Sequence, residues 1–172
     1  MYSRAAWAAL SAATLLMAAA TWQLLSGGDR VVAGAAVAGA GAGLLLGGAL
    51  AKRSPTAAWL RRWWFVDSTL DRVFDGALLG SIAWVTRDAD PAISAGALVA
   101  LGTGFLGSYV RARGAALGYG VEESPLTRAL RYGLLAVGLL AGWLSWTVWA
   151  IAAVSIVAAV VRTSQVAKEE RA

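Results

Sequence analysis

The sequence contains no cysteine and no histidine among its 172 residues. The chain therefore has no disulfide bonds, no thiol nucleophile, no imidazole for acid–base catalysis and no zinc site built on Cys or His. Carboxylates, hydroxyls and backbone oxygens are the metal ligands that remain, and they prefer hard cations such as Mg²⁺, Mn²⁺ or Ca²⁺. Any metal site in this chain must be built from oxygen.

Charge is also scarce, since 15% of the residues are charged and 59% are hydrophobic. Soluble domains carry about 25% charged residues. Uncharged runs recur at bilayer length, because about 20 apolar residues cross a hydrocarbon core of about 30 Å. The sequence predicts an all-α integral membrane protein, one domain over residues 1–172, with a bundle of six transmembrane helices. Their expected bounds are roughly 5–25, 31–51, 64–86, 92–110, 125–141 and 145–164.

The last two spans come from one uncharged stretch, Tyr132 to Val161. Its 30 residues exceed the range of about 17–25 for one span. We predict a break near Gly142, and the fifth helix then carries Arg128 and Arg131 in its first turns, where their side chains can extend to the headgroups. A single long tilted helix is the alternative.

Basic residues predict the orientation, because loops rich in Lys and Arg stay cytoplasmic. Six spans leave Arg30 and Arg87 on one side of the membrane and the other 13 of the 15 basic residues on the opposite side. Both termini are therefore expected to be cytoplasmic, in the inner (plasma) membrane. Topology accounts for the net charge of +5, so we expect membrane lipids and no nucleic acid as partners.

Small residues recur in the second span at Gly39, Gly43 and Gly47. A spacing of four residues places them on one face of the helix, where another helix backbone can approach closely. We expect this face to pack inside the bundle rather than to form a dimer.

Three acids, Asp67, Asp71 and Asp75, follow one another in steps of four within the third span. Such a step rises about 6 Å and turns about 40° beyond a full circle, so the three carboxylates share one face. Like charges at this spacing repel, and an acid at mid-bilayer costs about 2.5–3.5 kcal/mol on the insertion scale. The three acids therefore need cations.

Two sources of cations are open. A divalent ion between Asp67 and Asp71 would neutralise the pair, because hard metals bind carboxylate oxygens. Salt bridges would do the same, with Arg72 on the same helix or with basic residues on that side of the membrane, namely Arg61, Arg62, Arg111 and Arg113. The spacing by itself does not distinguish these alternatives.

The segment DSTLDRVFDG, residues 67–76, resembles the second half of the signature DxxDGxxAR…GxxxDxxxD of the CDP-alcohol phosphatidyltransferase family. In that family the aspartates bind two divalent cations that hold the pyrophosphate of CDP-diacylglycerol. The resemblance implies the family's six-span fold, with Mg or Mn as cofactor. It also implies that Asp67 and Asp71 are metal ligands, that Asp71 is the catalytic base, and that Asp75 is structural or auxiliary.

A second segment, Ser108-Tyr109-Val110-Arg111-Ala112-Arg113 followed by Leu117-Gly118, resembles SYxRARAxxxG of phosphatidylinositol-phosphate-synthase-like members of this family. The resemblance implies that Arg72, Arg111 and Arg113 bind substrate phosphates through charge-assisted hydrogen bonds. It further implies CDP-diacylglycerol as a ligand and a homodimer, or a related membrane subunit, as the assembly.

The first half of the signature is degraded. Aligning residues 44–53 with DxxDGxxAR puts Leu44 and Gly47 where the first two aspartates belong, while Gly48 and Lys52 match or nearly match the rest as auxiliary residues. An alternative register puts Leu45 and Gly48 there instead. Either way both carboxylates are absent.

Two further observations concern the signature. Trp63 replaces the glycine that precedes the third aspartate by four residues. The acids that could substitute are Glu122 and Glu123, in the loop before the fifth span.

Two functions follow. One is transfer of a phosphatidyl group from CDP-diacylglycerol to an alcohol in phospholipid biosynthesis, with release of CMP. The alternative is a pseudoenzyme, a catalytically silent member of the family that binds a lipid nucleotide or serves as a membrane partner subunit. Two aspartates on one helix would hold two metal ions poorly.

Overall fold

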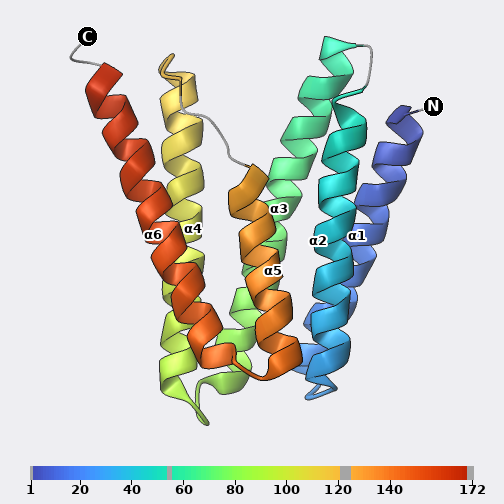
Figure 1. Ribbon diagram of the computed structural model, residues 1–172, viewed down its shortest axis with the longest axis vertical. Helices are drawn as coiled ribbons and strands as arrows, with labels where there is room; N and C mark the ends of the chain where they lie inside the picture. The colour runs from blue at the N-terminus through green and yellow to red at the C-terminus, as the bar shows by residue number, and fades with distance from the viewer. Residues whose placement is uncertain (1, 54–55, 121–124, 170–172) are drawn as a thin grey trace.

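The computed structural model describes residues 2–53, 56–120 and 125–169, and these residues contain six α-helices and no strand (Figure 1). The helices are α1 (Tyr2–Leu25), α2 (Arg30–Ala51), α3 (Ala57–Thr86), α4 (Pro91–Ala116), α5 (Pro125–Ala141) and α6 (Leu144–Glu169). The prediction of an all-α chain is confirmed, and each expected span lies within one of these helices or begins at its first residue.

Four of the described helices, α1, α2, α4 and α6, are long and apolar enough to cross a membrane. Helix α3 has 30 residues but carries charged side chains along its middle, and α5 has only 17 residues. The structure thus supports a membrane protein with four clear candidate spans. The two helices outside this group are the two that carry the buried charges.

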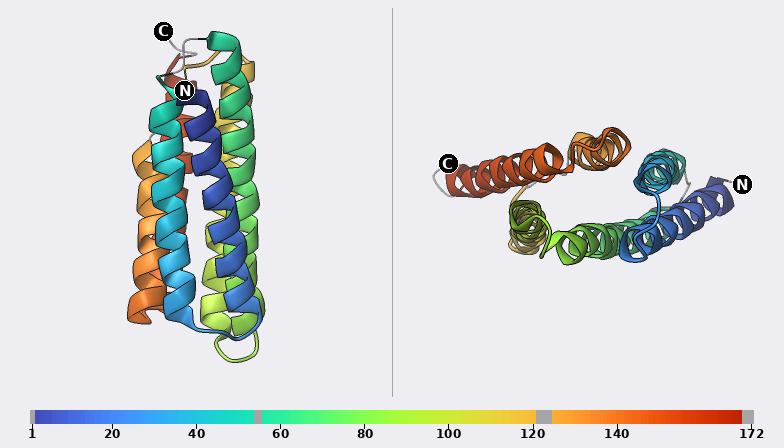
Figure 2. Two further views of the ribbon diagram at one scale, coloured as in Figure 1. Left: turned by 90° about the vertical axis from the view of Figure 1, so that its right-hand side faces the viewer. Right: turned by 90° about the horizontal axis from the view of Figure 1, so that it is seen from below.

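The six helices form a closed ring. Each helix packs mainly on two neighbours, in the order α1, α2, α5, α6, α4, α3 and back to α1, and α2 also touches α3. Figure 2 shows this ring from below, with α5 and α3 on opposite sides. Three connections, α1–α2, α3–α4 and α5–α6, lie at one end of the bundle, and both termini lie at the other (Figure 1).

Local chemistry explains where the helices begin and end at the connection end. The side chain of Asp29 accepts a hydrogen bond from the Val31 amide at 2.7 Å and caps α2, and Asp90 caps α4 in the same way. Gly142 has φ +77°, a conformation that L side chains rarely adopt, and it separates α5 from α6. The predicted break near Gly142 is confirmed, and the single long helix is wrong.

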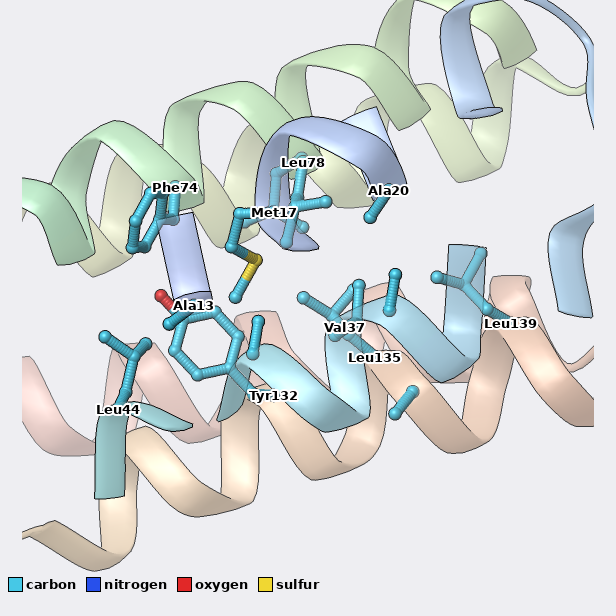
Figure 3. Close-up of a cluster of buried hydrophobic side chains, with 14 of the residues drawn as sticks. Ala13, Met17, Ala20, Val37, Leu44, Phe74, Leu78, Tyr132, Leu135 and Leu139 are labelled. Carbon is cyan, nitrogen blue, oxygen red and sulfur yellow. The ribbon is translucent and has the colours of Figure 1, made fainter. Parts of the chain in front are cut away.

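The core between α1, α2, α3 and α5 is apolar, as Figure 3 shows for Met17, Val37, Leu78 and Leu135. Two glycines of the predicted stripe face α1: a Cβ on Gly43 would lie 3.3 Å from the Ala13 Cβ, and one on Gly39 would lie 3.1 Å from Leu16. A Cβ on the third, Gly47, would lie 3.2 Å from the Trp63 ring of α3. The expectation that this stripe packs inside the bundle is confirmed for Gly43 and Gly47, whereas Gly39 is exposed at the edge of the contact.

Candidate functional site

Asp67, Asp71 and Asp75 all lie buried on α3, with no more than 2% of any of them exposed. The predicted shared face is confirmed, since the other buried residues of α3 follow the same stripe, from Trp63 to Leu78. We call these three residues the acidic ladder. Burial of three carboxylates is costly unless cations or hydrogen-bond donors meet them.

Two arginines of α5 meet the acidic ladder. Arg128 donates from Nη1 to Asp67 Oδ2 at 2.7 Å, and its Nε lies 3.2 Å from Asp71 Oδ1. Arg131 donates from Nη2 to Asp71 Oδ2 at 2.8 Å, and its Nε lies 2.7 Å from Asp75 Oδ1. Each arginine therefore bridges two neighbouring carboxylates.

The expectation that Arg128 and Arg131 extend to the headgroups is wrong. Their side chains are only 11% and 9% exposed and point into the ring. The reason is electrostatic, because guanidinium groups gain more from buried carboxylates directly opposite than from an interface that is already rich in basic residues.

Asp71 is the centre of the cluster. Besides the two arginines of α5, it accepts hydrogen bonds from Arg72 and from the Tyr132 hydroxyl, the latter at 2.9 Å. Arg72 also lies 2.7 Å from Asp75 and donates to the Gly104 carbonyl of α4 at 3.2 Å. Both oxygens of Asp71 are therefore engaged by donors.

The cluster is formally neutral, because three carboxylates face the three guanidinium groups of Arg72, Arg128 and Arg131. Among the described residues, no Cα atoms of α3 and α5 approach within 8 Å. The long arginine side chains span this separation, and their forked donors suit carboxylate pairs better than lysine would. Charged side chains thus join the two helices in place of backbone packing.

A two-metal centre does not fit the side chains that surround the ladder. Within the described ranges, no group of three acidic side chains is arranged to hold a metal ion. Trp63 is fully buried, and a Cβ on Gly47 would lie 3.2 Å from its Cη2 and Cζ2 atoms, so the indole fills the space in which a side chain at 47 would lie. Leu44 is buried in the apolar core (Figure 3).

The alternative alignment register adds no metal ligand, because Leu45 and Gly48 line a pocket without contributing a carboxylate. Glu122 and Glu123 lie outside the described residues. Metal clamping needs several anionic ligands around each ion. At the described positions that align with the two missing aspartates, the chain has leucine and glycine in either register.

Of the predicted phosphate-binding residues, the structure brings Arg72 and Arg111 to the site. Both line a small polar pocket beside Asp71, where Arg128 and Arg162 join them. Arg113 is exposed near the end of α4 and does not line this pocket.

A larger pocket of about 620 Å³ lies between α2, α3 and α5. Its lining includes Leu44, Leu45, Trp64, Lys52, Arg53 and Arg128. Lys52 and Gly48, expected as auxiliary residues, both lie in this lining. The pocket is apolar along α2 and basic where Lys52, Arg53 and Arg128 contribute, and Arg128 connects it to the acidic ladder.

The site residues that sequence reasoning missed are Arg128, Arg131, Tyr132 and Arg162. One signal could have found the first three, because spacings of three and four residues place them on one face of a helix. A helix face with two arginines and a tyrosine is complementary in charge and hydrogen bonding to the face of α3 that carries the acidic ladder. For Arg162, whose Nη1 donates to the Gly107 carbonyl at 3.0 Å, the sequence has no comparable signal.

The chain resembles two characterised proteins over parts of its length. It is 40% identical over 77 residues to phosphatidylinositol phosphate synthase of Corynebacterium glutamicum, covering 43% of this chain and 35% of that protein. It is 36% identical over 131 residues to archaetidylinositol phosphate synthase of Methanothermobacter thermautotrophicus, covering 75% of this chain and 63% of that protein. The chain thus spans less than two thirds of either relative.

No protein-family model matches the chain, and no solved structure matches it. The two relatives are members of the family that the aspartate segment resembles. By this homology, the chain is a relative of the CDP-alcohol phosphatidyltransferases.

Proposed function

We propose that this chain is a catalytically silent CDP-alcohol phosphatidyltransferase-like membrane protein, which binds CDP-diacylglycerol or a similar anionic lipid without transferring its phosphatidyl group. One observation carries the proposal: Asp67 and Asp71, the two signature aspartates that the chain retains, and the neighbouring Asp75 are all paired with arginines of the chain itself. The names of the two relatives, both synthases of inositol phosphate lipids, support a role of such a protein in phospholipid synthesis.

The state of Asp71 argues against turnover. A general base must have an oxygen within hydrogen-bond reach of the proton that it takes. Both Asp71 oxygens already accept hydrogen bonds, from Arg131 and Arg72 on one oxygen and from Tyr132 on the other. A substrate hydroxyl would have to displace one of these donors.

The larger pocket supports lipid binding. Its walls at Leu44, Leu45 and Trp64 are apolar, and Lys52 and Arg53 lie at the end of α2 that is nearest the termini. An amphipathic ligand fits this division, with acyl chains along the apolar wall and phosphates beside the cations. The smaller pocket, with Arg111 and Arg162, is the second place where a phosphate would find cations.

The distribution of charge supports a placement with both termini cytoplasmic in the plasma membrane. The end that bears the termini carries basic residues such as Lys52, Arg53, Arg61 and Arg62, as cytoplasmic ends do. In this placement all six helices cross the membrane, because α3 has its charges neutralised inside the ring and α5 is shielded by its neighbours.

The opposite end carries the pattern expected of the outer interface. Its exposed aromatic side chains are Trp22, Trp84, Trp143 and Trp146, and tryptophan is enriched where headgroups meet hydrocarbon. The guanidinium of Arg87 lies 4.0 Å from the Trp84 ring. A homodimer, or a complex with a related membrane subunit, is the assembly that we propose for this placement.

The test has two arms on the purified protein in lipid nanodiscs. In the first, CDP-diacylglycerol, Mn²⁺ or Mg²⁺ and a panel of alcohols are added, and CMP release is measured against an active relative. We expect no release above the background of Asp71→Asn. CMP release that Asp71→Asn abolishes would establish an enzyme and overturn the silent role.

The second arm measures binding of CDP-diacylglycerol to the same nanodiscs. Lys52→Gln with Arg53→Gln is expected to weaken binding by about tenfold or more, because two of the cations that line the pocket are lost. Arg62→Gln, which changes an exposed arginine on α3, is the matched control and should bind as the parent does. Equal binding by all three proteins would exclude this pocket.

The active enzyme is the second candidate. Its support is the retention of Asp67 and Asp71 and the names of the relatives, both of which are synthases. The assay of CMP release decides between the two candidates.

A further inference from the structure

The acidic ladder raises a question that is separate from lipid binding, namely what neutralises it in the folded protein. We infer that Arg128 and Arg131 are built-in counterions of Asp67, Asp71 and Asp75, and that they replace divalent cations, so that arginine and metal occupation of the ladder exclude each other. This inference concerns the ladder itself and does not depend on whether the larger pocket takes a lipid.

The register of the two helices supports this role. Arg128 contacts the first and second carboxylates of the ladder, and Arg131 contacts the second and third. Arginines three residues apart rise about 4.5 Å along α5, whereas aspartates four residues apart rise about 6 Å along α3. The forked guanidinium groups absorb this difference, because each has several N–H donors directed at different oxygens.

The carboxylate oxygens are already in close contact with nitrogen. Nitrogen–oxygen distances of 2.7–3.2 Å join the two arginines to the ladder. Mg²⁺ requires oxygen ligands at about 2.0–2.1 Å in near-octahedral geometry. An ion bound between Asp67 and Asp71 would compete with Arg128 for Asp67 Oδ2, and it would find both Asp71 oxygens contacted, Oδ1 by Arg128 and Oδ2 by Arg131.

Charge counting leads to the same exclusion. The ladder and its three arginines sum to zero, −3 plus 3, so a divalent cation would add two uncompensated charges to a buried site. Without Arg128 and Arg131, the ladder and Arg72 sum to −3 plus 1, which is −2. One divalent cation would neutralise that remainder. The variant without these arginines is therefore expected to become a metal-binding protein.

Contacts with other helices would keep the bundle together when the two arginines are replaced and a metal ion binds. Helix α5 packs on α2 and α6, and α3 packs on α1 and α4, so neither is held in the ring by the ion pairs alone. The ion pairs neutralise the acidic ladder between α3 and α5, and the contacts with the other helices keep both helices in the ring.

The experiment measures Mn²⁺ binding by electron paramagnetic resonance and the melting temperature in detergent, with MnCl₂ or with EDTA and without any lipid substrate. The parent protein should bind no Mn²⁺ and should melt at the same temperature in both solutions. Arg128→Gln with Arg131→Gln should bind one Mn²⁺ per chain and melt higher with MnCl₂ than with EDTA. Adding Asp71→Asn to that variant should abolish both effects, and Arg62→Gln should behave as the parent does.

Two outcomes would overturn the inference. One is Mn²⁺ bound by the parent and lost in Asp71→Asn, because the ladder would then hold metal despite its arginines. The other is a folded double arginine variant that binds no Mn²⁺. Since these measurements involve no lipid and no turnover, their failure is distinguishable from failure of the proposed function.

A second set of variants covers the case in which the double arginine variant does not fold. Arg131→Met, Asp75→Asn and their combination form a double-mutant cycle on one arm of the cluster. If Arg131 is the counterion of Asp75, the combination should melt higher than Arg131→Met alone. Strictly additive losses in the cycle would contradict a counterion role.

Discussion

Helices α1 and α2 meet through glycine and alanine, whereas α3 and α5 face each other across a separation that arginine and aspartate side chains bridge. The first contact depends on the absence of side-chain atoms, and the second depends on long side chains with complementary charge. Packing of small residues is disrupted by added side-chain volume, and it involves no charged group. The charged contact tolerates changes of volume but no unpaired charge.

This comparison predicts where the bundle is most sensitive. Arg131→Met is expected to have the largest effect, a loss of about 3–5 kcal/mol in the free energy of unfolding, because it leaves Asp71 and Asp75 buried with one cation fewer. Thermal unfolding in detergent measures the loss. Arg62→Gln changes an exposed residue of α3. It should change the free energy of unfolding by less than about 0.5 kcal/mol. Equal stability of both variants would mean that the ion pairs do not hold α3 and α5 together.

The packed contact is expected to show the next largest effect. In Gly43→Leu the added side chain would meet the Ala13 Cβ and the Ala9 carbonyl, each 3.3 Å from the position of its Cβ. Overpacking of this kind costs about 1–3 kcal/mol. The control is Gly48→Leu, since no atom lies within 4 Å of a Cβ at Gly48. Melting temperatures that fall equally in both variants would show that the effect is not due to the contact between α1 and α2.

The smallest effect is expected at the break between α5 and α6. Gly142→Ala places a Cβ on a residue with φ +77°, and an unsuitable residue at such a position costs about 1 kcal/mol. Gly133→Ala is a suitable control, because Gly133 lies within α5 and no atom is within 4 Å of a Cβ there. Thermal unfolding should show a loss for Gly142→Ala and no loss for Gly133→Ala. The opposite order would contradict our account of the break.

Much of the fold could be predicted because it depends on local chemistry. Uncharged runs of bilayer length predict the helices, and Gly142 predicts the break that makes six helices out of five runs. The shared face of Asp67, Asp71 and Asp75 follows from helix geometry, which is the same in any context. The inward packing of the glycine stripe in α2 follows from the same regularity.

The partners of the acids could not be predicted from spacing. Arg128 and Asp67 are 61 residues apart, and Arg131 and Asp71 are 60 apart, so their contact depends on how α5 is placed around the ring. The sequence offers several counterions for the acids, namely Arg61, Arg62, Arg72, Arg111 and Arg113, and it predicts that the arginines of α5 extend to the headgroups. The position of α5 between α2 and α6 decides this choice.

Local sequence pattern is enough to show that the chain is helical and apolar, that Asp67, Asp71 and Asp75 share a helix face, and that two carboxylates of the family signature are absent. Tertiary structure alone decided that arginines of α5 neutralise those acids and that Trp63 fills the space at Gly47. The physical reason is the distance along the chain over which each kind of interaction acts. Helix periodicity and conformational preference act within a few residues, whereas the pairing of buried charges requires that two helices distant in the chain be brought face to face.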